Sequence, residues 1–205
     1  MTTVVNHTVK ADLIRALRKL LRVARYIDYE RLTWYVARLT DRLTEEVERT
    51  VGSELPPCDD WTPVNITRPL LNIVAIVSGL IFLGPDLYRS PEYLRSAIDY
   101  TIDITAAVGQ LKAWPWWMRP IMSRMLPDVV RLRMHREDVR RFLTPVIEER
   151  RRLKAAGEQL PDDTLQWLLN RADEAGITDL ADITHMQLLL TMAAIHTTTL
   201  TATRM

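Results

Sequence analysis

The feature that most restricts the fold of this chain is a helical spacing of apolar residues that continues through almost its whole length. Between residues 123 and 156 apolar side chains recur every seven residues, and helical spacing also orders residues 8–21 and 29–51. This spacing places the apolar side chains on one face of an amphipathic helix. Eleven prolines against only six glycines separate these stretches, so few flexible loops are expected. The pattern predicts a mainly α-helical protein of one domain, residues 1–205, without strands.

Turn formers and helix-capping residues divide the chain into helices. Ser90 followed by Pro91 is typical of a helix start, whereas the prolines between residues 115 and 120 interrupt the helix that precedes them. The uncharged run 70–84 is shorter than the roughly 20 apolar residues of a membrane span, which favours a helix buried in a soluble core. Helices are predicted at about 65–84, 90–112 and 123–156, from Asp162 or Asp163 to the residue before Gly176, and from Asp179 into the C-terminus.

Charge and cysteine content exclude several classes of protein. The 27 Lys and Arg residues nearly balance the 26 Asp and Glu residues, so a nucleic-acid-binding protein, which usually has a strong basic excess, is not expected. One cysteine, Cys58, excludes a disulfide framework and a cysteine-rich metal site. The four histidines are scattered, and even His185 and His196, on one helix face, would lie roughly 16 Å apart. No metal site is predicted.

Two segments are candidates for contact with other molecules. Residues 131–154 hold nine Lys or Arg and four acids, which indicates either a solvated helix face with internal ion pairs or contact with an anionic membrane surface or a partner protein. Trp114, Trp116 and Trp117 surround Pro115. Indole rings suit a membrane or protein boundary, and they equally suit a core-packing turn. The sequence leaves both pairs of alternatives open.

The C-terminal helix combines small and hydroxyl residues in an otherwise bulky apolar segment. Ala193 and Ala194 precede three consecutive threonines, Thr197 to Thr199. A threonine hydroxyl in a helix can donate to the carbonyl four residues earlier. The segment therefore predicts either a shallow groove with polar edges, in which a flat ligand could lie, or a close helix crossing through the alanines.

The order of several short motifs carries further information. In chain order they are Asp60-Trp-Thr-Pro-Val-Asn65, the buried run with Ile81-Phe-Leu-Gly-Pro-Asp86, Trp114-Pro115, Leu126-Pro127, Pro161-Asp-Asp-Thr164 and residues 186–199. In this order and spacing the chain resembles a fungal cytochrome P-450 monooxygenase of the branch that includes ent-kaurene oxidase-like enzymes. The resemblance implies a partial cytochrome P-450 fold, made of the helices that precede the long distal helix and the first part of that helix.

The resemblance also implies catalytic roles on the last helix. Residues 193–198, Ala-Ala-Ile-His-Thr-Thr, are similar to the family's oxygen-activation motif. Thr197 takes the place of the threonine that relays protons in that motif. His196 stands where the family usually has an acid, and a histidine can also carry protons near neutral pH. Thr197 and His196 are therefore the expected catalytic residues.

Cofactor contacts follow from the same comparison. Ala194 would leave room above the heme, with Thr198 beside it. Lys10, with His7 nearby, would pair with a heme propionate, a role that requires a cation. The family's iron ligand is a cysteine in a Phe-x-x-Gly-x-x-x-Cys motif, and Cys58 has neither that context nor that position. The axial cysteine is therefore absent, and no metal ligand is predicted.

The resemblance implies a function for full-length relatives and a different expectation for this chain. Such relatives hydroxylate a small apolar secondary metabolite, such as a terpenoid, at the endoplasmic-reticulum membrane, with heme and an NADPH-cytochrome reductase. This chain is expected to be a truncated, inactive form without bound heme or the family's membrane anchor, cytoplasmic or in peripheral membrane contact. Residues 23–36 are a suspected intron-derived insert, and the last codons are compatible with a splice donor. The alternative is a non-catalytic helical interaction protein or a pseudogene product.

The expected truncation has a physical consequence. A distal helix without its usual neighbours would expose a large apolar face, which predicts poor solubility or a partly molten state.

Overall fold

The computed structural model describes residues 17–21, 29–55, 57, 58, 60 and 62–203. These residues form helices and connecting turns without strands, which confirms the mainly α fold. Residues 17–21 are helical. The longer helices are α2 (Tyr29–Glu54), α3 (Thr67–Leu83), α4 (Pro91–Ala113), α5 (Arg119–Met125), α6 (Pro127–Ala156), α7 (Thr164–Glu174) and α8 (Leu180–Ala202).

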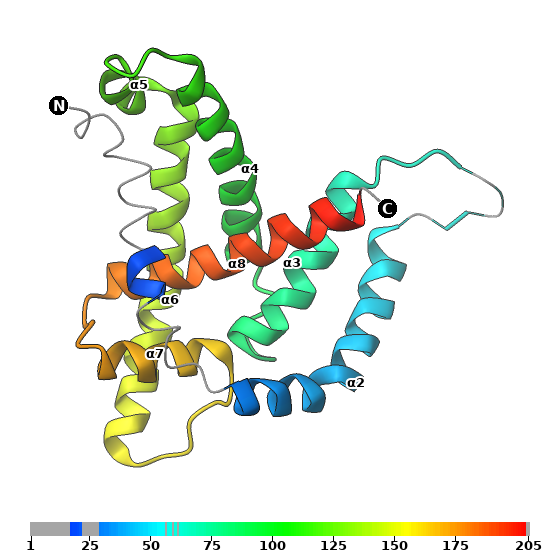
Figure 1. The fold of residues 1–205 in the computed structure, drawn as a ribbon. Helices are drawn as coiled ribbons and strands as arrows, with labels where there is room; N and C mark the ends of the chain where they lie inside the picture. Colours follow the sequence, from blue (N-terminus) through cyan, green and yellow to red (C-terminus); the bar gives the residue numbers. More distant parts are fainter. Residues whose placement is uncertain (1–16, 22–28, 56, 59, 61, 204–205) are drawn as a thin grey trace.

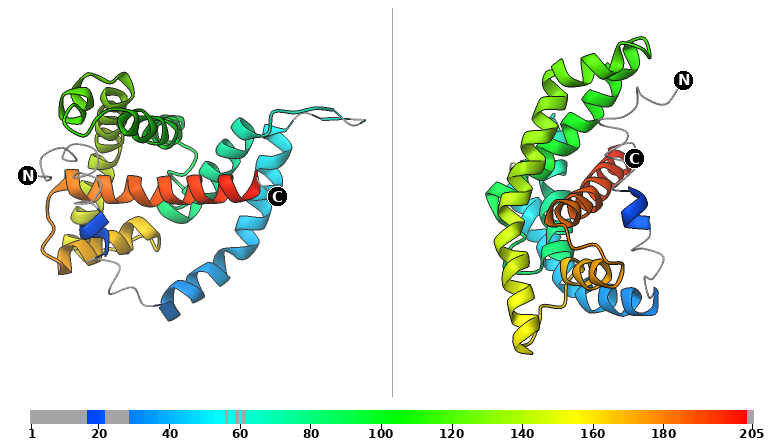
Figure 2. Two further views of the ribbon diagram at one scale, coloured as in Figure 1. Left: turned by 45° about the horizontal axis from the view of Figure 1, so that its top comes forward. Right: turned by 90° about the vertical axis from the view of Figure 1, so that its left-hand side faces the viewer.

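Helix α8 crosses the middle of the molecule and contacts most of the other helices. It packs against α3, α4, α6 and α7, while α4 packs beside the first part of the longer α6 (Figure 1). Helix α2 packs on α3 at the far side from α6, and α5 lies at the end of the α4–α6 pair (Figure 2). The C-terminal helix is therefore held by helices from both halves of the chain.

The first half of α8 forms the centre of the core. Residues 183–189 are all buried, because a helix that crosses between other helices has apolar neighbours on every side. The largest fully buried side chains of α8 and the helices around it are mainly aliphatic and include Leu83, Leu143, Ile147, Leu165, Ile183, Met186, Leu188 and Ile195.

The predicted start of the longest helix differs from the observed one. A helix from about Ser123 with kinks at Pro127 and Pro145 was expected, but α5 ends at Met125 and a separate helix, α6, begins at Pro127. Leu126 has a ψ of 125°, an extended conformation, because proline disfavours the helical conformation in the residue before it. Pro145 lies inside α6 without ending it.

Capping hydrogen bonds confirm the predicted starts of the last two helices, α7 and α8. The Asp163 carboxylate accepts from the backbone N–H of Gln166 at 2.8 Å, and the Asp179 carboxylate accepts from that of Ala181 at 2.9 Å. Each bond satisfies an N–H group that the first turn of a helix leaves without a partner.

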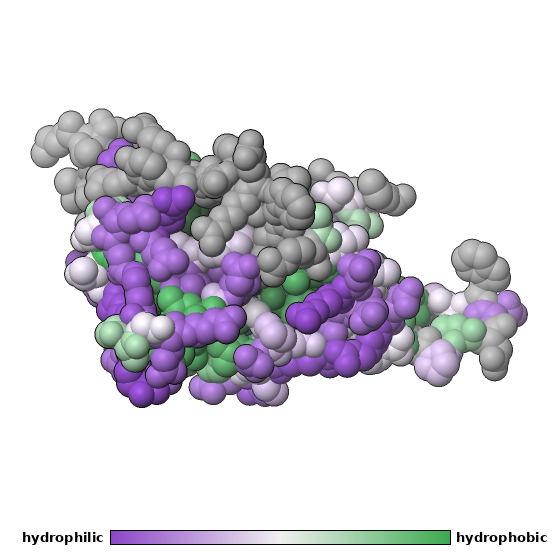
Figure 3. All heavy atoms as spheres, turned by 90° about the horizontal axis from the view of Figure 1, so that it is seen from below, coloured by the Kyte–Doolittle hydropathy of each residue, from purple (hydrophilic) through white to green (hydrophobic). Residues whose placement is uncertain are grey.

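The charged segment of α6 forms ion pairs both within the helix and with its neighbours. Arg140 donates to Glu137, and Arg152 donates to Glu149, one turn apart on the exposed face. Arg150 instead binds Asp163 just before α7, and Arg131 binds both Asp103 of α4 and Asp128 of its own helix. Figure 3 shows the lower face, to which α2, α7 and the end of α6 contribute; it is mainly hydrophilic with narrow apolar strips. The solvated face with internal ion pairs is therefore present.

The expected apolar face on α8 is not present. Leu200, 42% exposed, is the single large hydrophobic side chain of α8 that is exposed in the described part of the chain. The second half of α8 instead exposes alanine and threonine side chains. Four of the six most exposed large apolar side chains in the described part of the chain lie on α5 and the turn before it; the other two are Leu21 and Met134.

Candidate functional site

The second half of α8 presents a stripe of small and hydroxyl side chains to solvent. Ala193, Thr197 and Thr201 are exposed, and their spacing of four residues places them on one face. The Thr197 hydroxyl donates to the Ala193 carbonyl at 2.7 Å, and the Thr201 hydroxyl donates to the Thr197 carbonyl at 2.8 Å. These bonds confirm the predicted back-bonding and leave each hydroxyl oxygen able to accept a hydrogen bond. Ala193 is exposed and Ala194 is half-buried, so the described residues do not form a close helix crossing through Ala193.

The predicted site residues of α8 lie on this stripe or at its edge. Thr198 is exposed, whereas Ala194 and His196 are half-buried. The helix therefore brings together Ala194, His196 and the two adjacent threonines within about a turn. The other two predicted residues, His7 and Lys10, lie outside the described residues.

A buried polar chain that the sequence analysis did not predict lies below the first half of α8. The Thr191 hydroxyl donates to the Gln187 carbonyl at 3.1 Å, and the Tyr93 hydroxyl lies 2.8 Å from the Thr191 hydroxyl. Because Thr191 has one proton, Tyr93 is the donor in the second bond. Burial raises the pKa of Tyr93 to about 12, although contacts with Thr191 and Gln187 oppose that rise. The tyrosine therefore stays protonated and ties α4 to α8.

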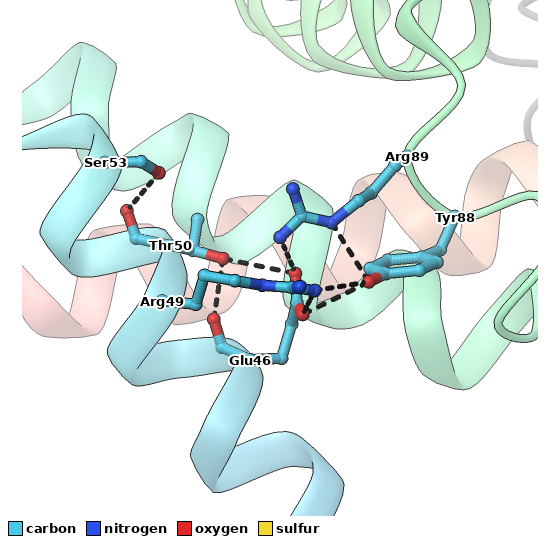
Figure 4. Close-up of polar contacts among 6 residues, drawn as sticks. All are labelled: Glu46, Arg49, Thr50, Ser53, Tyr88 and Arg89. Atoms are coloured by element: carbon cyan, nitrogen blue, oxygen red, sulfur yellow. Dashed lines mark hydrogen bonds and ion pairs between the residues drawn. The ribbon is translucent and has the colours of Figure 1, made fainter.

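A second polar cluster holds α2 against the turn that follows α3 (Figure 4). Glu46 is 4% exposed and accepts from Arg49 at 2.5 Å, from Arg89, and from the Tyr88 hydroxyl at 3.1 Å. Arg49 and Arg89 also donate to the Tyr88 hydroxyl, at 3.0 and 2.9 Å. Burial alone would raise the pKa of Glu46, but the hydrogen bonds from Arg49, Arg89 and Tyr88 outweigh it and hold the pKa below 4.5. The carboxylate of Glu46 already has hydrogen-bond partners within the protein, which suits a structural role in holding α2 against the turn after α3.

Comparison with known proteins decides the family. No family model and no solved structure matches the chain, but curated proteins do. The cytochrome P-450 monooxygenase TES1 of Alternaria alternata is 35% identical over 166 residues, which are 80% of this chain and 33% of that protein. The cytochrome P-450 monooxygenases adrA of Penicillium rubens and paxP of Penicillium paxilli are 34% and 33% identical over 82% and 85% of this chain, and over 33% and 35% of their own lengths. The chain belongs to the cytochrome P-450 family.

The chain spans about a third of the length of these cytochrome P-450 relatives. Within the described residues, no helix is long and apolar enough to cross a membrane. The suspected insert at 23–36 falls partly outside the described residues, and its last residues, from Tyr29, begin α2.

The exposed, small side chains of Ala193 and Thr197 on α8 are compatible with contact to one face of the heme that cytochrome P-450 proteins use. The other requirement, an axial thiolate, is not met by these residues. Cys58 is exposed between α2 and α3, and no group of three or more His, Cys, Asp or Glu side chains capable of holding a metal occurs among the described residues. The described residues therefore supply no axial ligand for the iron of a heme.

Proposed function

We propose that this segment supplies the distal, oxygen-activating side of a fungal cytochrome P-450 monooxygenase that hydroxylates a small apolar secondary metabolite such as a terpenoid. The observation that carries the proposal is the exposed stripe of α8, at the positions that are similar to the family's oxygen-activation motif. Heme, when bound, supplies the oxidising chemistry, and an NADPH-cytochrome reductase supplies electrons. The proposed location is the endoplasmic-reticulum membrane.

In this proposal Thr197 and His196 move protons toward the open face. The Thr197 hydroxyl proton is held by the Ala193 carbonyl at 2.7 Å, and rotation about χ1 would direct it outward. His196 directly precedes Thr197 and is half-buried, which places an imidazole near enough to the face to replace the acid of the family motif. Because the side chain of Ala194 is small, it leaves space next to this part of the helix, and Thr198 lies beside that space.

Replacing Thr197 with alanine in the heme-loaded protein that carries this segment is expected to reduce product formed per NADPH by about 10²-fold, a usual effect of losing a proton-transfer group. Thr201→Ala is the matched control, because Thr201 lies one turn further along the same face with the same type of bond to the helix. Parallel measurement of product formation and NADPH consumption gives this ratio for both variants. Equal losses in the two variants would contradict a special role for Thr197.

The 205 residues by themselves are expected to give no thiolate Soret band after reduction and addition of CO. The reason is that their one cysteine, Cys58, is exposed in the connection between α2 and α3 and lacks the sequence context of the family's iron ligand. An absorption spectrum of the purified chain incubated with heme measures this. A thiolate band would contradict the inactive form, while its absence even in a longer protein with this segment would favour the alternative of a non-catalytic interaction protein.

We also propose peripheral membrane contact through α5 and the turn before it. Trp116, Trp117, Ile121 and Met125 are 58–68% exposed, and α5 lies at one end of the molecule (Figure 1). Indole rings and basic side chains together suit a membrane interface, and Arg124 is exposed on the same short helix. The exposure of Trp116 and Trp117 supports a boundary role rather than a core-packing turn.

A double substitution of Trp116 and Trp117 by alanine is expected to weaken partition onto lipid vesicles by about 10²-fold, because each indole buries apolar area worth roughly 1.5–3 kcal/mol. Co-sedimentation with phosphatidylcholine vesicles measures the partition without relying on tryptophan fluorescence. Val64→Ala is the control, because Val64 is 45% exposed outside α5. Unchanged sedimentation of the double variant would refute the contact.

A further inference from the structure

The side-chain amide of Gln187, on the first half of α8, is completely buried without a hydrogen-bond partner. Gln187 is 0% exposed, and neither its Nε2 nor its Oε1 atom forms a hydrogen bond with another described residue. Burial of an amide without a hydrogen bond is costly. Buried polar groups in folded proteins nearly always bind another protein group or an internal water. The Gln187 amide therefore indicates a binding site inside the core.

The nearest polar group to act on is the hydroxyl of Tyr93 on α4. Burial raises the pKa of Tyr93 to about 12, and Thr191 and Gln187 oppose that rise. A donor that faces the phenol oxygen has this effect, because it favours the charged form. Gln187 nevertheless makes no direct hydrogen bond. Two polar groups that lie close together without a direct bond are a usual arrangement for a bridging water.

The oxygen of Tyr93 has room for one more hydrogen bond. Its proton goes to the Thr191 hydroxyl at 2.8 Å, because the Thr191 proton is already donated to the Gln187 carbonyl at 3.1 Å. The phenol oxygen keeps a lone pair as an acceptor, and the Gln187 amide offers two N–H donors. A molecule that binds both groups must therefore accept one hydrogen bond and donate another.

The surroundings restrict such a molecule to a very small size. Tyr93 and Thr191 are each 1% exposed, and the ring of Phe142 on α6 packs against the Tyr93 ring with centroids 5.6 Å apart. Helices α4, α6 and α8 therefore shield these polar groups from solvent. Water is the smallest molecule that both accepts and donates, and internal waters commonly bind two to four polar groups.

We propose that one internal water molecule binds between the Gln187 amide and the Tyr93 hydroxyl. It accepts a hydrogen bond from the amide N–H₂ group and donates one to the phenol oxygen. The water thus joins α4 to α8 beside the direct Tyr93–Thr191 bond, and it allows a glutamine in an otherwise apolar core. Gln187 and Thr197 are ten residues apart, about 15 Å along the helix, so this site is separate from the α8 stripe and does not depend on heme.

NMR of the 205-residue chain with ¹⁵N-labelled glutamine tests the proposal. In a rotating-frame experiment the Gln187 N–H₂ protons should show a cross-peak to water with the sign of dipolar contact rather than of proton exchange, because an internal water stays bound much longer than a surface water. The Gln187→Met spectrum assigns these signals. Gln110 is the internal control, because it is exposed and its amide donates to Asp128, so it should show no dipolar cross-peak.

Two variants test whether Tyr93 holds the water. Tyr93→Phe should remove the cross-peak, because phenylalanine lacks the acceptor oxygen. Thr101→Val is the matched control and should keep it, because the Thr101 hydroxyl on the same helix is also buried but donates to the Ala97 carbonyl at 2.8 Å. An exchange-type cross-peak alone in the wild type, or a dipolar cross-peak unchanged by Tyr93→Phe or lost in Thr101→Val, would overturn the proposal.

A second measurement keeps the test independent of how Tyr93→Phe folds. The ¹⁷O relaxation dispersion of water counts long-lived internal waters, and it should show about one fewer in Gln187→Met than in the wild type. Methionine is similar to glutamine in size and has no amide, so the variant removes the donors with little change in packing. An equal count of internal waters in the two proteins would contradict the proposed site.

Discussion

Replacing Arg150 with methionine is expected to lower the free energy of unfolding by about 3–5 kcal/mol, because the change leaves a buried carboxylate without its cation. Arg150 on α6 donates to both carboxylate oxygens of Asp163, at 2.6 and 2.7 Å, and the two residues are 5% and 2% exposed. Asp163 also accepts from the backbone N–H of Gln166 at the start of α7. One carboxylate therefore fixes α7 against α6, and its loss of a partner affects both helices.

Urea unfolding at neutral pH, followed by circular dichroism, measures this change. Arg152→Met is a suitable control, because Arg152 binds Glu149 with the same two-bond geometry, at 2.8 and 2.6 Å, but on the exposed surface. Exposed ion pairs contribute little because solvent and salt screen them, so the control should unfold like the wild type. Similar unfolding midpoints for the two variants would show that burial does not make the Arg150–Asp163 pair more stabilising than the exposed Arg152–Glu149 pair.

The sequence predicted the helices well because their ends depend on local chemistry. Asp163 and Asp179 each cap a helix through an N–H only a few residues away, and such bonds can be inferred from neighbouring residues. Gly84 was likewise predicted as a helix end. Its φ of 80° suits glycine, but a Cβ there would also lie 2.9 Å from the Asp163 carboxylate. That second reason depends on a residue of another helix and could not be inferred from local sequence.

The candidate site was predictable only along one helix. The back-bonding of Thr197 follows from its own helix, so it could be predicted and was confirmed. Tyr93 and Thr191 are 98 residues apart, and Glu46 and Arg89 are 43 residues apart. Such contacts depend on which helices pack together. The spacing of apolar residues shows which face of a helix is buried, but not which other helix packs against that face.

Replacing Glu46 with glutamine is expected to lower the free energy of unfolding by about 2 kcal/mol at neutral pH. Hydrogen bonds to a charged group contribute about 1.5–3 kcal/mol, and the partial exposure of Arg49 and Arg89, 62% and 45% of their side chains, reduces this by screening. The variant also places an amide N–H₂ group among donors from Arg49, Arg89 and Tyr88 (Figure 4). Glu45→Gln, at an exposed position on the same helix, is the control and should leave stability unchanged.

The pH dependence of this difference separates the charge of Glu46 from its packing. The pKa of Glu46 is lower in the folded protein than its ordinary 4.5, so its charge stabilises the fold fully above pH 4.5, and the contribution is lost as pH falls through the folded pKa. The buried His185, with its pKa lowered to about 3 by burial and by Arg136, makes both proteins less stable as pH falls below 6.5. Because His185 acts equally in the two proteins, urea midpoints of wild type and Glu46→Gln should converge below about pH 4.5 and run parallel above it. A constant difference down to pH 3 would mean that the loss comes from packing rather than from the carboxylate charge.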